Sequence, residues 1–146
     1  MNVVHPLTVH LPIGLLIGSL LFTLLALRGG DQSYAQAGYH CLRAGWLALL
    51  PAVAAGLWDA SRLVFGASAP HTDALGLVNA HAASGLALMV AYWQAWQIRR
   101  RMPAVLDDPQ RRRGYLLWLA IGTALLLLSG WLGGQLVYAQ GVGVAR

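Results

Sequence analysis

The sequence predicts an all-α integral membrane protein built as a bundle of four transmembrane helices. Hydrophobic residues make up 58% of the chain and charged residues only 10%, against about 25% charged residues in ordinary soluble domains. Four apolar segments are each long enough to cross a bilayer, which takes roughly 20 residues, and none of them alternates as a strand does. We therefore expect one transmembrane domain over residues 1–146, with helices at about residues 6–27, 34–65, 72–102 and 109–138.

The first segment begins and bends at prolines. Pro6 suits the first position of a helix, where no amide hydrogen bond is lost. Pro12 stands one turn further on and should free the carbonyl of Thr8, which predicts a kink there. The sequence Arg28-Gly29-Gly30-Asp31 ends the segment.

The later segments carry their own start signals. Ser33 and Gln36 form a predicted capping box before the second helix, which has Pro51 near its middle and Asp59 near its end. Asp108 followed by Pro109 predicts the start of the fourth helix.

The basic residues predict the topology. The net charge is +5, and six arginines flank one short connection between apolar segments, namely Arg99, Arg100, Arg101, Arg111, Arg112 and Arg113. Short loops rich in arginine face the cytoplasm, so both termini should lie on the outer side. The same placement argues against nucleic-acid binding, because no aromatic-interleaved basic surface is present. The single Cys41 excludes an intrachain disulfide and a cysteine-based metal cage.

Two histidine–glycine faces are the main functional signal. His10, Gly14 and Gly18 share one face of the first helix, and His81 is followed by Gly85 in the third. Glycine inside a helix costs about 1 kcal/mol relative to alanine, so these glycines should bring a compensating gain. The gain is either close helix packing or room for a flat cofactor.

We interpret these faces as a haem b site. His10 and His81 would be the two axial ligands, and Gly14, Gly18 and Gly85 would give the porphyrin room. His5 is the rival of His10 or a partner for a haem propionate, and Asp59 would orient an imidazole. Two alternatives stay open: a non-haem metal site using His5, His10, His81 and Asp59, and a non-catalytic scaffold whose histidines only bond between helices. Hydrolytic chemistry lacks support, since the chain contains no glutamate and its serines lack a nucleophile-elbow context.

Several motifs in order resemble the bacterial domain-of-unknown-function family 2231. The opening His5-Pro6-Leu7-Thr8-Val9-His10-Leu11-Pro12-Ile13-Gly14 is similar to that family's signature, and residues 55–59 (AGLWD) are similar to its second-helix motif. His81 falls at a third-helix histidine, and residues 133–138 (GGQLVY) with 141–144 (GVGV) are similar to the family's ending. The resemblance implies a multi-pass protein of the bacterial inner membrane. Relatives that carry a Rieske-type domain imply a redox setting.

These inferences combine into one functional expectation. The chain should be a b-type haem protein in the lipid bilayer that transfers electrons at the periplasmic side. A quinone and a redox partner protein are the expected exchange partners. Glycine faces left unused inside one bundle would suit a homodimer.

Overall fold

The computed structural model describes residues 5–65 and 72–141, which form five helices. They are α1 (His5–Thr8), α2 (His10–Gly29), α3 (Gln32–Phe65), α4 (Thr72–Arg101) and α5 (Arg111–Tyr138). Within these two ranges no strand occurs, and α2 to α5 each hold a span long and apolar enough to cross a membrane. The predicted all-α fold with four membrane-compatible helices is therefore confirmed.

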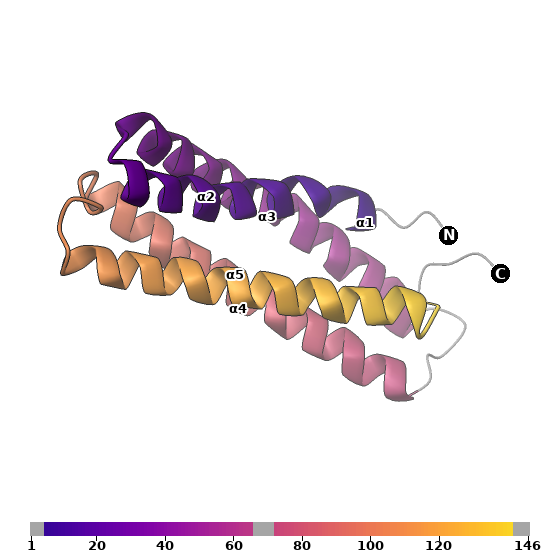
Figure 1. The fold of residues 1–146 in the computed structure, drawn as a ribbon. Coiled ribbons are helices and arrows are strands. Elements are labelled where there is room, and N and C mark those ends of the chain that lie inside the picture. The colour runs from indigo at the N-terminus through magenta and orange to yellow at the C-terminus, as the bar shows by residue number, and fades with distance from the viewer. Residues whose placement is uncertain (1–4, 66–71, 142–146) are drawn as a thin grey trace.

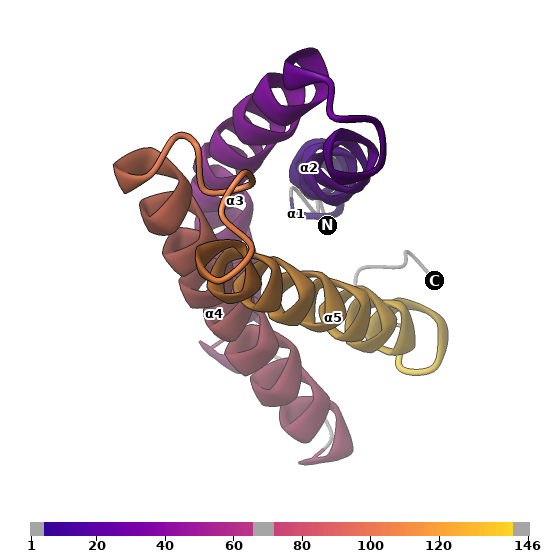
Figure 2. The same ribbon diagram turned by 60° about the vertical axis from the view of Figure 1, so that its left-hand side comes forward.

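The long helices form two antiparallel hairpins, α2 with α3 and α4 with α5, which then pack together. Figure 1 shows that α1 begins and α5 ends at one end of the bundle, which we call the terminal end. The α2–α3 and α4–α5 connections lie at the opposite end, which we call the arginine-loop end. Figure 2 shows α2 beside α3 and α5 beside α4 from a second direction. Both hairpins therefore expose their outer faces to lipid.

The first membrane segment is interrupted where its second proline predicts a kink. Helical geometry breaks at Val9, between α1 and α2. Pro12 cannot donate to the carbonyl four residues earlier, and its ring crowds that carbonyl. The backbone nevertheless stays bonded across the break, because the N–H of Val9 donates to His5 O and the N–H of Ile13 donates to Val9 O. The result is a short helix, α1, that is set off from the rest of the segment.

The α2–α3 turn is closed by a glycine and an aspartate. Gly30 adopts the left-handed conformation, with φ 67°, and its N–H donates to Ala26 O at 2.8 Å, as helix C-terminal glycines do. Asp31 Oδ1 accepts the N–H of Ser33 at 2.7 Å. The side chain that caps the start of α3 is thus Asp31, and Ser33, the expected capping residue, lies inside the helix two residues later.

Glycines set how closely the helices of each hairpin approach. A Cβ added at Gly38 on α3 would lie 3.0 Å from Thr23 Oγ1 and 3.3 Å from Ser19 O on α2. One added at Gly122 on α5 would lie 3.1 Å from ring atoms of Tyr92 on α4. Each hairpin therefore uses the missing side chain to bring backbone or ring against backbone.

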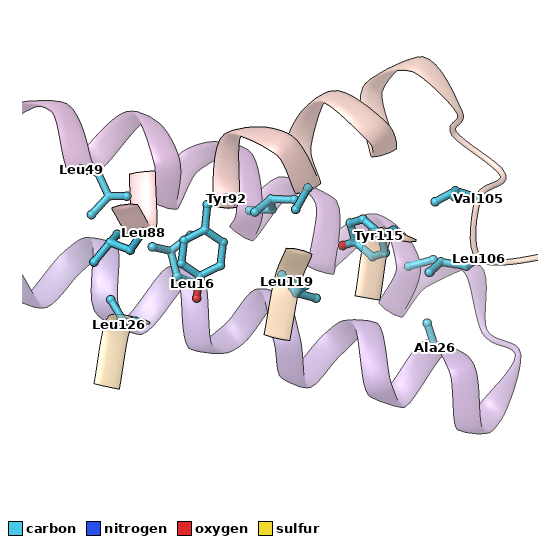
Figure 3. Close-up of a cluster of buried hydrophobic side chains, with 13 residues drawn as sticks. Leu16, Ala26, Leu49, Leu88, Tyr92, Val105, Leu106, Tyr115, Leu119 and Leu126 are labelled. Carbon is cyan, nitrogen blue, oxygen red and sulfur yellow. The ribbon is translucent and has the colours of Figure 1, made fainter. Parts of the chain in front are cut away.

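An apolar cluster fills the middle of the bundle. Leu16, Leu88, Tyr92, Leu119 and Leu126 are among its buried members, and they come from α2, α4 and α5 (Figure 3). Many large apolar side chains on the outside are exposed, including Leu21, Leu117 and Leu127. In water such a surface would be unfavourable, whereas a lipid-facing helix is expected to be apolar on its outside.

The arginine-loop end is held together by side chains that bond the backbone. Asp108 Oδ1 accepts the N–H groups of Gln110 and Arg111, at 2.9 and 3.2 Å, at the predicted cap before α5. Arg99 is buried and donates to Pro103 O in the loop and to Ala35 O on α3. Arg99 therefore ties the end of α4 to the α2–α3 hairpin.

Candidate functional site: a histidine pair

His5 is fixed by two hydrogen bonds to α3. Its ring Nδ1 lies 2.7 Å from Ala52 O, and its backbone N–H donates to Asp59 Oδ2 at 3.1 Å. Thr8 Oγ1 donates back to His5 O at 2.9 Å and closes the single turn of α1. The short helix left by the break at Val9 is therefore anchored to α3 at both its first backbone amide and its first side chain.

His81 is fixed to α5 in the same way. Its Nδ1 lies 3.0 Å from Ser129 O and 3.4 Å from Ser129 Oγ. One turn later on α4, Ser84 Oγ donates to His81 O at 2.8 Å. Both imidazoles thus use Nδ1 to bond a main-chain carbonyl of a neighbouring long helix.

The two rings lie against each other in a T-shaped arrangement, although 76 positions separate them in the sequence. Their centroids are 5.8 Å apart and their planes meet at 77°. A carbonyl oxygen can only accept, so each Nδ1 must carry the proton. In the neutral ring Nε2 then keeps a free lone pair, and among the described residues neither Nε2 takes part in a hydrogen bond. The pair can therefore offer two nitrogen donors.

A glycine makes room for each ring. A Cβ built on Gly56 of α3 would lie 3.0 Å from Cε1 and Nδ1 of His5, and one built on Gly133 of α5 would lie 3.2 Å from Cε1 of His81. Each imidazole is therefore placed against bare backbone. Glycine beside histidine was expected in this protein, but here the glycine stands on the neighbouring helix and makes room for the ring itself.

The other predicted site residues lie elsewhere. His10 is exposed, and a Cβ at Gly14 or Gly85 would meet no atom within 4 Å among the described residues. A Cβ at Gly18 would lie 3.7 Å from Cys41 Sγ, an ordinary contact. His10 stands five residues after His5, about 7 Å further along the helix axis. His5 matches the depth of His81, and His10 lies deeper.

Sequence reasoning paired His81 with His10, whereas the structure places His5 beside His81, and it did not name four residues that surround the rings. These residues are Ala52, Gly56, Ser129 and Gly133. Gly56 and Gly133 do occur in the motifs quoted above, so their presence was a signal. Asp59 was expected to orient an imidazole through its ring; in the structure it accepts the backbone N–H of the histidine instead.

The donor set consists of two imidazoles. Within the residues that the structure describes, no group of three or more His, Cys, Asp or Glu side chains is spaced to hold a metal ion. Two neutral imidazoles can bind a cofactor that brings its own further ligands, or they can bond helices together. The spacing and the protonation of the pair allow either role.

Comparison with known proteins gives a family and no assigned activity. The family described as "Predicted membrane protein (DUF2231)" matches residues 2–146. No curated protein and no solved structure matches the chain. The histidine pair and Gly56, Asp59 and Gly133 all lie in the matched region, while residues 142–144 of the carboxy-terminal motif lie outside the described residues. The match covers nearly the whole chain, and the protein therefore belongs to this family of membrane proteins.

Proposed function

We propose that this chain is a b-type haem protein of the membrane, with His5 and His81 as the axial ligands. The observation that carries the proposal is the facing pair of half-buried imidazoles, each held through Nδ1 by a backbone carbonyl. Histidines that ligate metals usually donate the other ring N–H in this way, which fixes the tautomer and raises the basicity of the ligating nitrogen. In this proposal His5 replaces His10, the ligand expected from the sequence.

The spacing of the rings supports ligation of a single metal centre. Metal–nitrogen bonds of about 2.0–2.1 Å place the ring centroids of two imidazoles on one ion roughly 5 to 6.5 Å apart, depending on the angle at the metal. Ligands on opposite sides of a haem iron would stand near the upper end of this range, and the observed 5.8 Å is slightly shorter. A bundle core of this kind is also a common place for cofactors held from facing helices.

The number of donors favours haem over a bare metal ion. A protein-bound transition metal usually has at least three protein ligands, and here two imidazoles come together among the described residues. Haem needs only axial ligands from the protein, and bound haem supplies one-electron redox chemistry. We propose that this chemistry serves electron transfer at the terminal end, with a quinone or a redox protein as partner.

The test is a spectrum with matched histidine variants. The protein is expressed with ample haem supply, purified in detergent and examined by a reduced-minus-oxidised visible spectrum and by haem content. We expect one haem per chain in the wild type, its loss in His5→Ala and His81→Ala, and its retention in His10→Ala. A wild type without haem, even after incubation with hemin, would overturn the proposal, as would full haem content in both the His5 and His81 variants.

A further inference from the structure

A second candidate site lies where α3 and α4 meet. Three tryptophans pack against one another there, with ring centroids 4.8 Å apart for Trp46–Trp93 and 5.3 Å apart for Trp46–Trp96 and Trp93–Trp96. Trp46 Nε1 donates to Met89 O on α4 at 3.0 Å, which fixes the register of the two helices. Trp93 remains 38% exposed on the outer surface. We call these three residues the tryptophan cluster.

Two exposed arginines stand on the same faces as the tryptophan cluster. Arg43 precedes Trp46 by three residues, and Arg100 follows Trp96 by four, spacings that put side chains on one face of a helix. Measured from the Trp46–Trp93 contact, Arg43 lies about 4.5 Å and Arg100 about 10 Å further toward the arginine-loop end. The two arginines therefore occupy neighbouring levels of the same α3–α4 surface.

Helix direction brings their side chains toward each other. Cα–Cβ bonds tilt toward the N-terminus of their helix. Because α3 begins at the arginine-loop end, Arg43 leans toward that end; because α4 finishes there, Arg100 leans back toward the middle of the membrane. The sequence contains no acidic residue from position 32 to 58 or from 74 to 106. Neither helix thus supplies a carboxylate to the band between the two guanidinium groups.

We propose that the tryptophan cluster with Arg43 and Arg100 is a binding site for the headgroup of an anionic phospholipid. Guanidinium groups bind phosphate oxygens in bidentate fashion, and tryptophans are enriched at the level of the headgroups. Basic pockets between transmembrane helices hold anionic headgroups elsewhere. The exposed face of Trp93 supplies apolar surface for the upper part of the acyl chains. A charged side chain placed as far along a membrane-spanning helix as Arg43 would be energetically costly without an anionic partner.

The test compares lipid compositions without added haem, so it is independent of the function proposed above. The protein is placed in nanodiscs of phosphatidylcholine, with or without phosphatidylglycerol, and its thermal unfolding is followed. We expect phosphatidylglycerol to raise the melting temperature by several degrees through binding to the folded state. The double variant Arg43→Gln/Arg100→Gln should lose most of this gain. Arg112→Gln/Arg113→Gln removes the same charge at the same end and should keep it.

Native mass spectrometry gives a second readout. Wild-type protein should retain phosphatidylglycerol on release from the nanodisc, and Arg43→Lys/Arg100→Lys should retain less, because lysine lacks the bidentate geometry. If Arg43→Gln/Arg100→Gln does not insert into the nanodisc, the lysine double variant alone tests the proposal. If both glutamine double variants lose the gain in melting temperature equally, the lipid is attracted by overall positive charge and not by this site, which would overturn the proposal. No gain in the wild type, or equal retention in the lysine variant, would overturn it as well.

Discussion

At the scale of single residues, the position of each imidazole depends on a glycine of the neighbouring helix. A Cβ at Gly133 would come 3.2 Å from His81 and a Cβ at Gly56 would come 3.0 Å from His5, whereas Cβ atoms at Gly85 and Gly14 would meet open space. We predict that Gly133→Ala and Gly56→Ala lower the free energy of unfolding by about 1–3 kcal/mol through overpacking. Gly85→Ala and Gly14→Ala should be neutral or gain up to about 1 kcal/mol from helix propensity.

Thermal or denaturant unfolding in detergent measures all four glycine variants. Gly133→Ala is compared with Gly85→Ala, and Gly56→Ala with Gly14→Ala. Within each pair the variants differ only in what the new methyl group contacts, so the effect of helix propensity cancels. Equal stability of Gly133→Ala and Gly85→Ala would contradict the close contact between His81 and α5.

Asp59 anchors α1 to α3 through a hydrogen bond to the backbone. Its Oδ2 accepts the backbone N–H of His5, which anchors α1 to α3. We predict that Asp59→Ala lowers the free energy of unfolding by roughly 1.5–3 kcal/mol, the range for hydrogen bonds to charged groups, and lowers haem content. Asp59→Asn keeps an acceptor oxygen and should retain most of both. If the asparagine variant behaves like the alanine variant, the carboxylate acts through its charge and not through this bond.

The histidine site could be predicted in part. An ionisable residue inside an apolar segment is a functional signal by itself, and this signal identified His81 and Asp59. Recognising that His5, and not His10, lies beside His81 required the depth of each histidine, which depends on how α1 turns at Val9. Helical phase alone could not supply it, because a straight first helix separates the two histidines by about 140°. The partners Ala52 and Ser129 contribute carbonyl oxygens, which no residue type reveals.

At the scale of elements, the α2–α3 hairpin depends on close backbone approach. A Cβ at Gly38 would meet backbone atoms, 3.2 Å from Thr23 N and 3.3 Å from Ser19 O, which cannot turn aside as a flexible side chain can. We predict that Gly38→Ala forces the helices apart and costs about 1–3 kcal/mol of unfolding free energy. Gly114→Ala on α5, where nothing lies within 4 Å, is the control and should not destabilise. An unchanged Gly38→Ala variant would mean that the hairpin is more loosely packed.

The start of α5 should respond to pH through Asp108. Hydrogen bonds from the N–H groups of Arg111 and Gln110 hold the pKa of this exposed carboxyl below its ordinary value of 3.8. A group whose pKa is lower in the folded state stabilises the fold above its unfolded pKa, and this contribution is lost as pH falls through the folded pKa. We predict that Asp108→Ala is less stable than wild type at neutral pH and that the difference shrinks below about pH 4. Melting curves across this range, with Asp107→Ala as the control, measure it.

Element boundaries were predictable where apolar length and breaker residues decide them. The helices of the structure end at Gly29 and Arg101, within two residues of the expected ends, because Gly30 and the arginine-rich loop follow directly. The start of α3 differs because Asp31, and not Ser33, supplies the capping oxygen. Which side chain caps a helix depends on the turn before it, and that turn was set by the left-handed Gly30.

At the scale of the whole molecule, polar side chains bond the backbone of neighbouring segments near both ends of the bundle, and the apolar cluster runs along its core. The histidine pair lies toward the terminal end, and Arg99, with its carbonyl partners, lies toward the arginine-loop end. Figure 3 shows the apolar cluster, which extends from Leu49 and Leu126 to Val105 and Leu106. Most members of that cluster are aliphatic, and the hydroxyls of its two tyrosines, Tyr92 and Tyr115, bond Thr123 and Thr23. A haem held by His5 and His81, as proposed above, would lie nearer the terminal end, and the electron partners of that proposal are expected on that side.

Which side of the membrane this is follows from charge, and it can be tested directly. Both the start of α1 and the end of α5 lie opposite the arginine-flanked loop (Figure 1). Arginine-rich short loops stay in the cytoplasm, so we predict that a fluorescent-protein fusion ending at Pro103 is fluorescent. A phosphatase fusion at the carboxy terminus should be active in the periplasm. Replacing Arg99 to Arg101 and Arg111 to Arg113 by glutamine should produce mixed orientation, whereas Arg28→Gln and Arg62→Gln should not. If instead the carboxy-terminal fusion reports a cytoplasmic end, the histidine pair lies nearer the cytoplasm, and the electron partners proposed above must be sought there.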